Sequence, residues 1–355
     1  MTTGVKTQIF LLVALLGFLT GPRVLALIST IEGSGSLAPQ TREKLAAPLA
    51  VNEVENTKIL IASSSDPYDT LKIEARSVYV WDINEHKKLY SKNEHTVLPL
   101  ASVTKMMMAL VAVETLPPDT KVSIAPIDIE EEGDSGLVVG EKWRLADLLK
   151  FTLIASSNDG ASAIASVAGA SLLHASSTDP FTNKKLFIKK MNEKAAAIGL
   201  TQTSFSSESG LDLTSMTSGA YSTTRDMAVL FEYILHKHPE LFTATTYAKI
   251  DLKSDSNIIH HVANTNAGVA MVTGIIGSKT GYTDLAGGNL VVVVDVGIDH
   301  PVVLAVLGSS RDGRFTDVEK LIEATVATIA DMPNEKETRS VSARITSTPS
   351  TEGIQ

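Results

Sequence analysis

The chain has 355 residues, 44% of them hydrophobic and 20% charged, which is long enough to bury one or two sizeable cores. Its formal net charge is −9 and no dense Lys/Arg stripe runs along it, so we expect no nucleic-acid partner. It contains no cysteine, which excludes disulfides, thiolate zinc sites and a cysteine nucleophile.

The N-terminus has the pattern of an export signal. Lys6 precedes a short apolar run, Ile9–Leu19, and a Gly-Pro pair and small residues follow it. The run is short for a membrane span, but Val24 replaces the usual alanine of a cleavage site. Residues 1–27 are therefore predicted to be a signal peptide or an N-terminal anchor that tethers the protein to the membrane. Either one places the protein outside the cytoplasmic membrane.

Two polar stretches flank one domain-sized block. Residues 28–68 are rich in Ser, Ala, Pro, Glu and Asn, which is typical of a linker. Residues 333–355 are polar and lack an apolar face, which indicates a disordered tail. Residues 69–332 are therefore predicted to form the folded domain.

Within that block, strand patterns lie at both ends and helical patterns lie between them. Apolar residues on both sides of Asp82–His86 predict a hairpin, and the apolar runs 289–297 and 301–308 predict an antiparallel pair. Helical patterns cover 102–116, 145–159, 160–171, 187–198, 225–237 and 315–332. This order predicts an α+β fold with one sheet built from the two ends of the block.

Three short motifs carry residues suited to chemistry. Ser102 and Lys105 form S-x-x-K at a predicted helix start, Ser156 and Asn158 form S-x-N between two predicted helices, and Lys279–Gly281 is K-T-G on a predicted edge strand. Alone, such motifs are more often a helix start, a turn or a strand end. Together, in this order and in these contexts, they indicate an active-site-serine hydrolase.

Ser102 is the predicted nucleophile. A serine hydroxyl needs an adjacent base, and residues i and i+3 share one face of a helix, so Lys105 can reach it. Free backbone N–H groups at the helix start favour negative charge that develops near Ser102. Lys105 acts as a base only when neutral, and we expect partial burial and a second cation, Lys279, to lower its pKa.

The remaining motif residues are predicted to handle the substrate. Ser156 and Asn158 could relay the proton and hydrogen-bond a substrate amide. Lys279 and Thr280 could hold a carboxylate, and Gly281 leaves room for a substrate backbone to lie against the strand.

Other polar features are interpreted as structural. His260 and His261 lack supporting ligands, so we expect no metal, and nothing indicates a cofactor. Glu130–Glu132 is expected to be a solvated acidic run, and Met106–Met108 to pack behind the nucleophile.

Whole segments around these motifs resemble the D-alanyl-D-alanine carboxypeptidase family, the low-molecular-weight penicillin-binding proteins. The likeness runs from about Ala75 to about Met332 and includes LPLASVTKMMMAL, KFTLIASSNDGASAIA, YSTTRDMAVL and GSKTGYTDLAGGNLVVVV. It implies a β-lactamase/transpeptidase-like fold, in which helices flank an antiparallel sheet and a helical subdomain is added. Residues 69–332 would then be a D,D-peptidase catalytic domain.

The resemblance implies a role for each motif. Ser102 would be acylated by the penultimate D-Ala carbonyl of a peptidoglycan stem peptide ending in D-Ala-D-Ala, releasing the terminal D-Ala. Lys105 would be the general base, and Ser156 and Asn158 would aid proton transfer and substrate positioning. Lys279–Gly281 would be the substrate-binding strand, and β-lactams would be covalent inhibitors.

The resemblance also extends to two groups outside the motifs. The backbone N–H groups of Ser102 and Tyr282 would form the oxyanion hole. Arg314 would lie near the terminal carboxylate of the substrate, where a planar guanidinium fits. A surface salt bridge is the alternative for Arg314, and Arg311 is a weaker candidate for the same role.

The chain departs from the family pattern at two places. Ser157 stands where glycine is usual, and SESGLD, residues 207–212, replaces a more typical Asn-Pro-His-Gly-Leu-Asp run. We expect neither departure to touch a reacting group.

Three rival functions stay open at this point. A class A β-lactamase would need a glutamate four residues before an asparagine, and Glu193 is the candidate, yet Ala197 stands four residues later. A D,D-endopeptidase of the same family would share the active-site residues. A catalytically inactive wall-binding protein would not need the three motifs intact.

Overall fold

A computed structural model describes residues 66–133, 135–172 and 179–331. The predicted signal or anchor at 1–27, almost all of the linker at 28–68 and the tail at 333–355 lie outside the described residues. In the part of the chain that is described, no helix is both long and apolar enough to cross a membrane.

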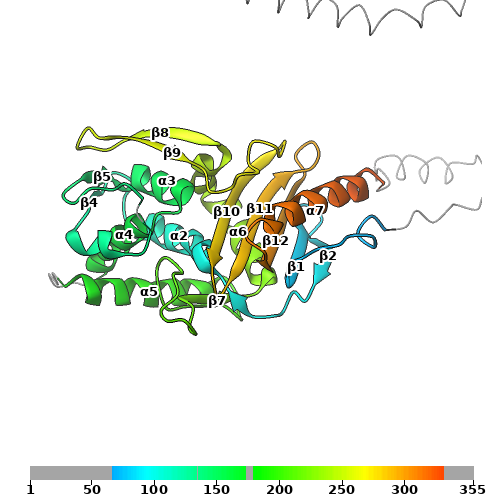
Figure 1. Cartoon of the computed structure of the whole chain (residues 1–355), viewed down its shortest axis with the longest axis horizontal. Coiled ribbons are helices and arrows are strands. Elements are labelled where there is room, and N and C mark those ends of the chain that lie inside the picture. Colours follow the sequence, from blue (N-terminus) through cyan, green and yellow to red (C-terminus); the bar gives the residue numbers. More distant parts are fainter. Residues whose placement is uncertain (1–65, 134, 173–178, 332–355) are drawn as a thin grey trace, which may run out of the picture. The chain divides into compact units, whose positions relative to one another are not determined.

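A five-stranded antiparallel sheet joins the two ends of the folded block, as the sequence predicts (Figure 1). Its strand order is β10-β11-β12-β1-β2. The strands are β1 (Ser77–Asp82), β2 (Lys87–Lys92), β10 (Ile275–Thr283), β11 (Gly287–Asp295) and β12 (Pro301–Ser309). The order places β10, which carries K-T-G, at one edge of the sheet, where no strand of the described residues pairs with its outer side.

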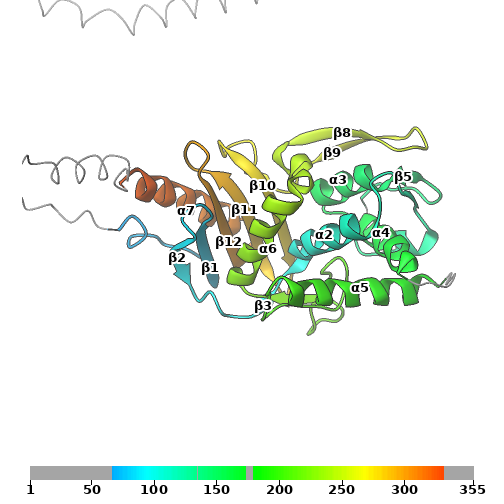
Figure 2. The same cartoon turned by 180° about the vertical axis from the view of Figure 1, so that it is seen from behind.

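Alternating side chains of the central strands enter two separate cores. One face, with Val291, Val293 and Val303, packs with α6 (Thr224–Lys237) in the larger core. The opposite face, with Val292 and Leu304, packs against α7 (Gly313–Ala330). The two helices therefore cover opposite faces of the sheet, α7 in front in Figure 1 and α6 in front in Figure 2. Because both faces are buried, these strands are continuous apolar runs.

A group of helices adjoins the β10 edge of the sheet. These are η1 (Ala101–Thr104), α2 (Lys105–Thr115), α3 (Leu145–Ala155), α4 (Asn158–Ser171) and α5 (Pro180–Ala197). Residues 105–112 of α2 are all buried, Met106–Met108 among them, which confirms the packing role predicted for the methionines. Gly169 lets α4 and α5 touch, since a Cβ there would lie 1.9 Å from the Asn183 carbonyl oxygen.

Shorter elements complete the framework around these helices. They are β3 (Leu98–Pro99), β4 (Lys121–Ser123), η2 (Pro126–Glu130), β5 (Lys142–Arg144), β6 (Ser204–Phe205), β7 (Ala220–Ser222), η3 (Pro239–Thr246), β8 (Lys249–Lys253) and β9 (Ile259–Ala263). The pairs β4–β5 and β8–β9 are antiparallel hairpins, and β7 lies between β3 and β6. Because η1 contacts β10, the S-x-x-K and K-T-G motifs lie side by side.

The folded unit begins earlier than residue 69. Tyr68, assigned to the linker from composition, is 4% exposed and stacks on Tyr90 with ring centroids 4.9 Å apart. Its hydroxyl also lies 2.8 Å from the Thr325 hydroxyl on α7. Composition alone missed this residue because its partners are far away in sequence.

Asp317 on α7 connects three elements of the second core. Its buried carboxylate accepts hydrogen bonds from the backbone N–H groups of Glu74 and Ala75 at 3.0 and 2.9 Å, and from the Ser309 hydroxyl at 2.7 Å. It thereby joins α7 to the end of β12 and to the segment that leads into β1.

Replacement of Asp317 by alanine is expected to lower the free energy of unfolding by about 3 kcal/mol, because buried donors lose their acceptor. Urea denaturation followed by circular dichroism measures the change. Glu319→Ala, at an exposed position of the same helix, is the matched control and should change stability by less than about 0.5 kcal/mol. Equal effects of the two substitutions would contradict this prediction.

Candidate active site

Ser102 is the partly exposed residue of an otherwise buried turn. Ala101, Val103 and Thr104 of η1 are buried, while Ser102 keeps some solvent access. Two glycines press against this turn. A Cβ at Gly210 would lie 2.0 Å from the Ala101 carbonyl oxygen, and one at Gly281 would lie 2.6 Å from that of Leu100. Ser102 therefore lies on a turn that neighbouring backbone holds in place.

Lys105 begins α2 directly after this turn and is fully buried. Its Nζ lies 2.8 Å from Ser102 Oγ, 2.7 Å from Asn158 Oδ1 and 3.0 Å from the Ser209 carbonyl oxygen. Three acceptors match the three donors of an ammonium group. When Lys105 is neutral, its lone pair can face Ser102 while its two N–H groups stay bonded to Asn158 and Ser209.

Burial lowers the pKa of Lys105 to about 7, which makes a neutral amine available near neutral pH. The charges of Glu208, Glu131 and Asp159 act in the opposite direction and raise it. The expectation that Lys279 also lowers the pKa of Lys105 is not supported, because burial is the cause that lowers it. The repulsion between the two lysines instead helps to lower the pKa of Lys279, which burial already depresses strongly.

Ser156 and Asn158 lie at the junction of α3 and α4, as predicted. Ser156 ends α3 in a left-handed conformation, with φ of 61°. Ser157, the departure from the family pattern, caps α4 by accepting a hydrogen bond from the Gly160 N–H at 2.9 Å. Ser156 and Asn158 each contact one of the two lysines. Lys279 Nζ donates to Ser156 Oγ at 2.8 Å, and Lys105 Nζ lies 2.7 Å from Asn158 Oδ1.

The K-T-G residues occupy the edge strand β10. Lys279 and Thr280 are buried, and the Thr280 hydroxyl lies 2.6 Å from that of Thr265. Gly281 brings the strand against Ser102, since a Cβ there would lie 3.1 Å from the Ser102 backbone nitrogen. Tyr282, the next residue, is 42% exposed. The backbones of Ser102 and β10 are thus neighbours, as an oxyanion hole shared by Ser102 and Tyr282 requires.

Arg314 lies at the start of α7 and contacts the same strand edge. It is 8% exposed, and its Nη1 donates to the Gly281 carbonyl oxygen at 2.6 Å. Burial lowers its pKa from the ordinary arginine value. The alternative of a surface salt bridge therefore does not describe this side chain. Arg311 instead lies over the exposed ring of Tyr282, 5.2 Å from its centroid.

Residues 207–212 contribute a hydrogen-bond acceptor to the site, which was not expected from the sequence. The expectation that SESGLD touches no reacting group is wrong, because the Ser209 carbonyl accepts a hydrogen bond from Lys105. Glu208 is buried, and Gly210, at φ of +81°, packs on the nucleophile turn. The glycine of this segment is the sequence signal that could have marked it, because glycine is favoured where the backbone is left-handed.

Two other acidic or basic residues also differ from simple solvated surface. Glu131, expected within a solvated run, pairs with Lys184 at 3.1 Å. His260 is mostly buried and bonds Glu141 at 2.8 Å between Trp143 and Phe151.

Glu193, the candidate base of a class A β-lactamase, lies elsewhere. Its side chain is 50% exposed and pairs with Lys189 and Lys190 on α5. It therefore does not reach Ser102 as a deacylating base would.

A sequence model of peptidase family S11, described as D-alanyl-D-alanine carboxypeptidase, matches residues 62–311. The chain belongs to this family. It is 30% identical to D-alanyl-D-alanine carboxypeptidase DacF of Bacillus subtilis over 70% of this chain and 61% of that protein. It is 31% identical to a D-alanyl-D-alanine endopeptidase of Pseudomonas aeruginosa over 70% of this chain and 76% of that protein.

Solved structures of penicillin-binding proteins share the fold. The Streptomyces K15 DD-transpeptidase superposes with a TM-score of 0.64 at 27% identity, covering 72% of this chain and 98% of that one. Penicillin-binding protein D2 of Listeria monocytogenes, in an ampicillin-bound form, gives 0.60 at 27% identity over the same shares. These matches confirm the predicted β-lactamase/transpeptidase-like fold. The chain spans 61% and 60% of the lengths of DacF and of the Escherichia coli carboxypeptidase DacC.

Lys105 is expected to titrate with a midpoint near pH 7, several units below an ordinary lysine, because its ammonium form is buried. Heteronuclear NMR of lysine-labelled protein measures the midpoint from the Cε and Nζ shifts. The signal that disappears in Lys105→Met identifies the residue. A midpoint near 10 for that signal would contradict the prediction.

Proposed function

We propose that this chain is a serine-type D-Ala-D-Ala carboxypeptidase, which trims the terminal D-alanine from peptidoglycan stem peptides through an acyl-enzyme on Ser102. The observation that carries the proposal is the 2.8 Å contact between Ser102 Oγ and the buried Lys105 Nζ. Membership of the family supports the substrate, and the contact supports the chemistry.

In the acylation step, neutral Lys105 takes the proton of Ser102 as Oγ attacks the penultimate D-Ala carbonyl carbon. General-base catalysis of this kind contributes a factor of about 10² to 10⁴. Asn158 Oδ1 and the Ser209 carbonyl hold the two remaining N–H groups, so Lys105 need not move as it gains the proton. The base is therefore already oriented before the substrate arrives.

Backbone N–H groups of Ser102 and Tyr282 stabilise the negative charge that develops on the substrate carbonyl oxygen. The closeness of β10 to the nucleophile turn at Gly281 supports this pairing. One such donor is worth a factor of about 10² to 10³ in rate.

The substrate binds as an added strand along the free edge of β10. Ser156, which accepts a hydrogen bond from Lys279, relays the proton that Lys105 took from Ser102 to the departing amine of the terminal D-alanine, so Lys105 becomes neutral again. The C–N bond breaks as the Ser102 ester forms. Water then attacks the ester with Lys105 again as the base, the ester bond breaks, and the proton returns to Ser102.

The reaction takes place outside the cytoplasmic membrane, with residues 1–27 as a signal peptide or tether. β-Lactams acylate Ser102 as substrate mimics. The ampicillin-bound penicillin-binding protein of Listeria monocytogenes, similar in fold, supports this second statement.

A D,D-endopeptidase that cuts cross-links is the second candidate. Relatives of that name from Pseudomonas aeruginosa and Escherichia coli are 31% and 29% identical to this chain, and the chain covers 76% and 84% of them. The same Ser102 chemistry would serve both reactions, since both cleave a D-Ala–containing amide. The products separate them.

Incubation with a stem pentapeptide is expected to remove one alanine, seen by mass spectrometry as loss of a single terminal residue. Ser102→Ala should abolish the loss, because no acyl-enzyme forms. The rate should rise with pH through about 7, as Lys105 loses its proton. An unchanged pentapeptide together with cleavage of a cross-linked dimer would favour the endopeptidase instead.

Arg314 is expected to recognise the free terminal carboxylate together with Thr280. Arg314→Gln should lower kcat/KM for the pentapeptide at least about tenfold, since a charge-assisted bond is lost. For the same peptide with a C-terminal amide, wild type and variant should differ much less. Steady-state kinetics on both peptides measures this, and equal losses would show that Arg314 only supports the strand.

A further inference from the structure

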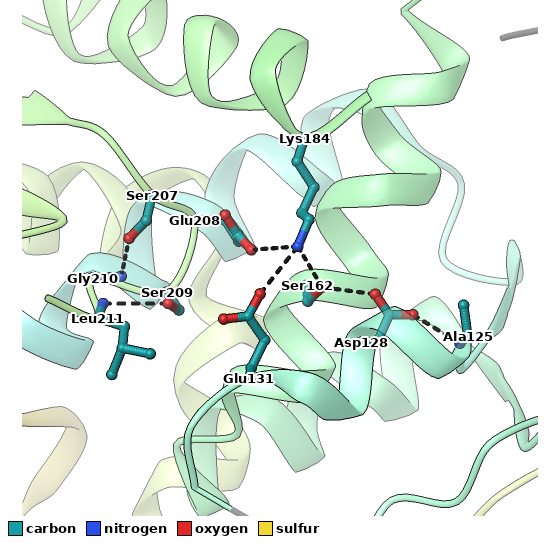
Figure 3. Close-up of polar contacts among 10 residues, drawn as sticks. All are labelled: Ala125, Asp128, Glu131, Ser162, Lys184, Ser207, Glu208, Ser209, Gly210 and Leu211. Carbon is teal, nitrogen blue, oxygen red and sulfur yellow. Dashed lines mark hydrogen bonds and ion pairs between the residues drawn. The ribbon is translucent and has the colours of Figure 1, made fainter. Parts of the chain in front are cut away.

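A cluster of charged side chains surrounds Lys184 on α5, outside the S-x-x-K, S-x-N and K-T-G motifs. Lys184 on α5 has a side chain only 15% exposed. Its Nζ lies 3.1 Å from Glu131 Oε1, 3.7 Å from Glu208 Oε1 and 3.0 Å from the Ser162 hydroxyl (Figure 3). One lysine thus joins α5, α4, the end of η2 and the segment 207–211.

Each carboxylate belongs to the residue just before one whose backbone carbonyl accepts a hydrogen bond from an active-site side chain. Glu208 is followed by Ser209, whose carbonyl accepts a hydrogen bond from Lys105 at 3.0 Å. Glu131 is followed by Glu132, whose carbonyl accepts a hydrogen bond from Asn158 Nδ2. Asn158 in turn accepts a hydrogen bond from Lys105. The two anions of the cluster are therefore each one residue from the groups that orient the base.

The cluster is fixed from its far side as well. The Ser162 hydroxyl, which accepts from Lys184, donates to the buried Asp128 carboxylate at 2.7 Å. That carboxylate also accepts from the Ala125 N–H at 2.8 Å. On the near side, Ser207 Oγ accepts from the Gly210 N–H at 2.9 Å and shapes the turn that presents Ser209 (Figure 3).

We propose that Lys184 is a positioning residue for the general base, because it holds the two backbone segments that carry the Ser209 and Glu132 carbonyls against Lys105 and Asn158. The inference rests on the proposed function, in which Lys105 is that base. Lys184 contacts no reacting atom, so it acts only through Glu208 and Glu131.

The charges in the cluster also reach the base. Lys105 is faced by Glu208 from segment 207–211, by Glu131 beyond η2, by Asp159 on α4 and by Lys279 on β10. The three carboxylates raise the pKa of Lys105, against the stronger effect of burial. Burial raises the pKa of Glu208, and the positive charge of Lys184 opposes that rise.

Four single variants and one double variant of the full chain separate positioning from general stability. Lys184→Met removes the cation, and Lys184→Arg keeps it. Glu208→Gln removes one anion, and Lys184→Met with Glu208→Gln removes both partners. Lys189→Met is the matched control, because that lysine lies on the same helix with a side chain 74% exposed. The readouts are the rate of Ser102 labelling by a fluorescent penicillin as a function of pH, and Tm.

We expect Lys184→Met to slow labelling at pH 7 about tenfold or more, with Lys184→Arg restoring most of the rate. Glu208→Gln should move the pH midpoint of labelling downward by about one pH unit, since an anion that favours protonated Lys105 is gone. The double variant should be faster than Lys184→Met alone, because the buried Glu208 carboxylate is then not left without its cation. Lys189→Met should match wild type.

A lower Tm for Lys184→Met with an unchanged rate and midpoint would reduce Lys184 to a structural role and overturn the proposal. The same follows if Lys184→Arg labels as slowly as Lys184→Met, or if Glu208→Gln leaves the midpoint unchanged. Failure of the proposed function is a different result, in which the wild-type protein neither labels with penicillin nor shortens the pentapeptide.

Discussion

A fully buried amine within hydrogen-bonding distance of a serine is the constraint on which the rest of this site depends. Burying a charged ammonium is costly, so the Lys105 environment favours the neutral amine that catalysis requires. A neutral amine must still have its two N–H groups satisfied, and Asn158 and the Ser209 carbonyl do this. Because Lys105 must be both buried and hydrogen-bonded, the segments that carry Asn158 and Ser209 must pack against the start of α2.

The sheet positions β10 beside the turn that carries Ser102. Because α6 and α7 bury both of its faces, β10 is held firmly while its outer edge stays available. Gly281 then allows the edge to approach the nucleophile turn more closely than any side chain would permit. The β10 edge and Ser102 are therefore placed by backbone packing, while Lys105 and Lys279 depend on side-chain hydrogen bonds to their partners.

Local patterns predicted the parts of the structure that local physics determines. The hairpin at Asp82–His86 follows from alternation, the antiparallel pair β11–β12 from continuous apolar runs, and the junction at Ser156 from helix periodicity. Contacts between distant segments did not follow, because the Ser209 carbonyl lies 104 residues from Lys105. The sequence did contain a signal for Lys184. This lysine lies three residues before the buried Phe187 and therefore on the buried face of its helix.

The segment SESGLD, through Glu208, shows how burial and nearby carboxylates have opposite effects on the pKa of Lys105. Burial alone would drive the pKa of Lys105 downward, and a base with too low a pKa accepts protons poorly. Glu208, Glu131 and Asp159 act against burial, yet burial still prevails, since the pKa remains at about 7. A carboxylate placed near the base can do this only while it stays ionised in its own buried position. The requirement for a partner cation at Lys184 follows from the same desolvation that activates Lys105.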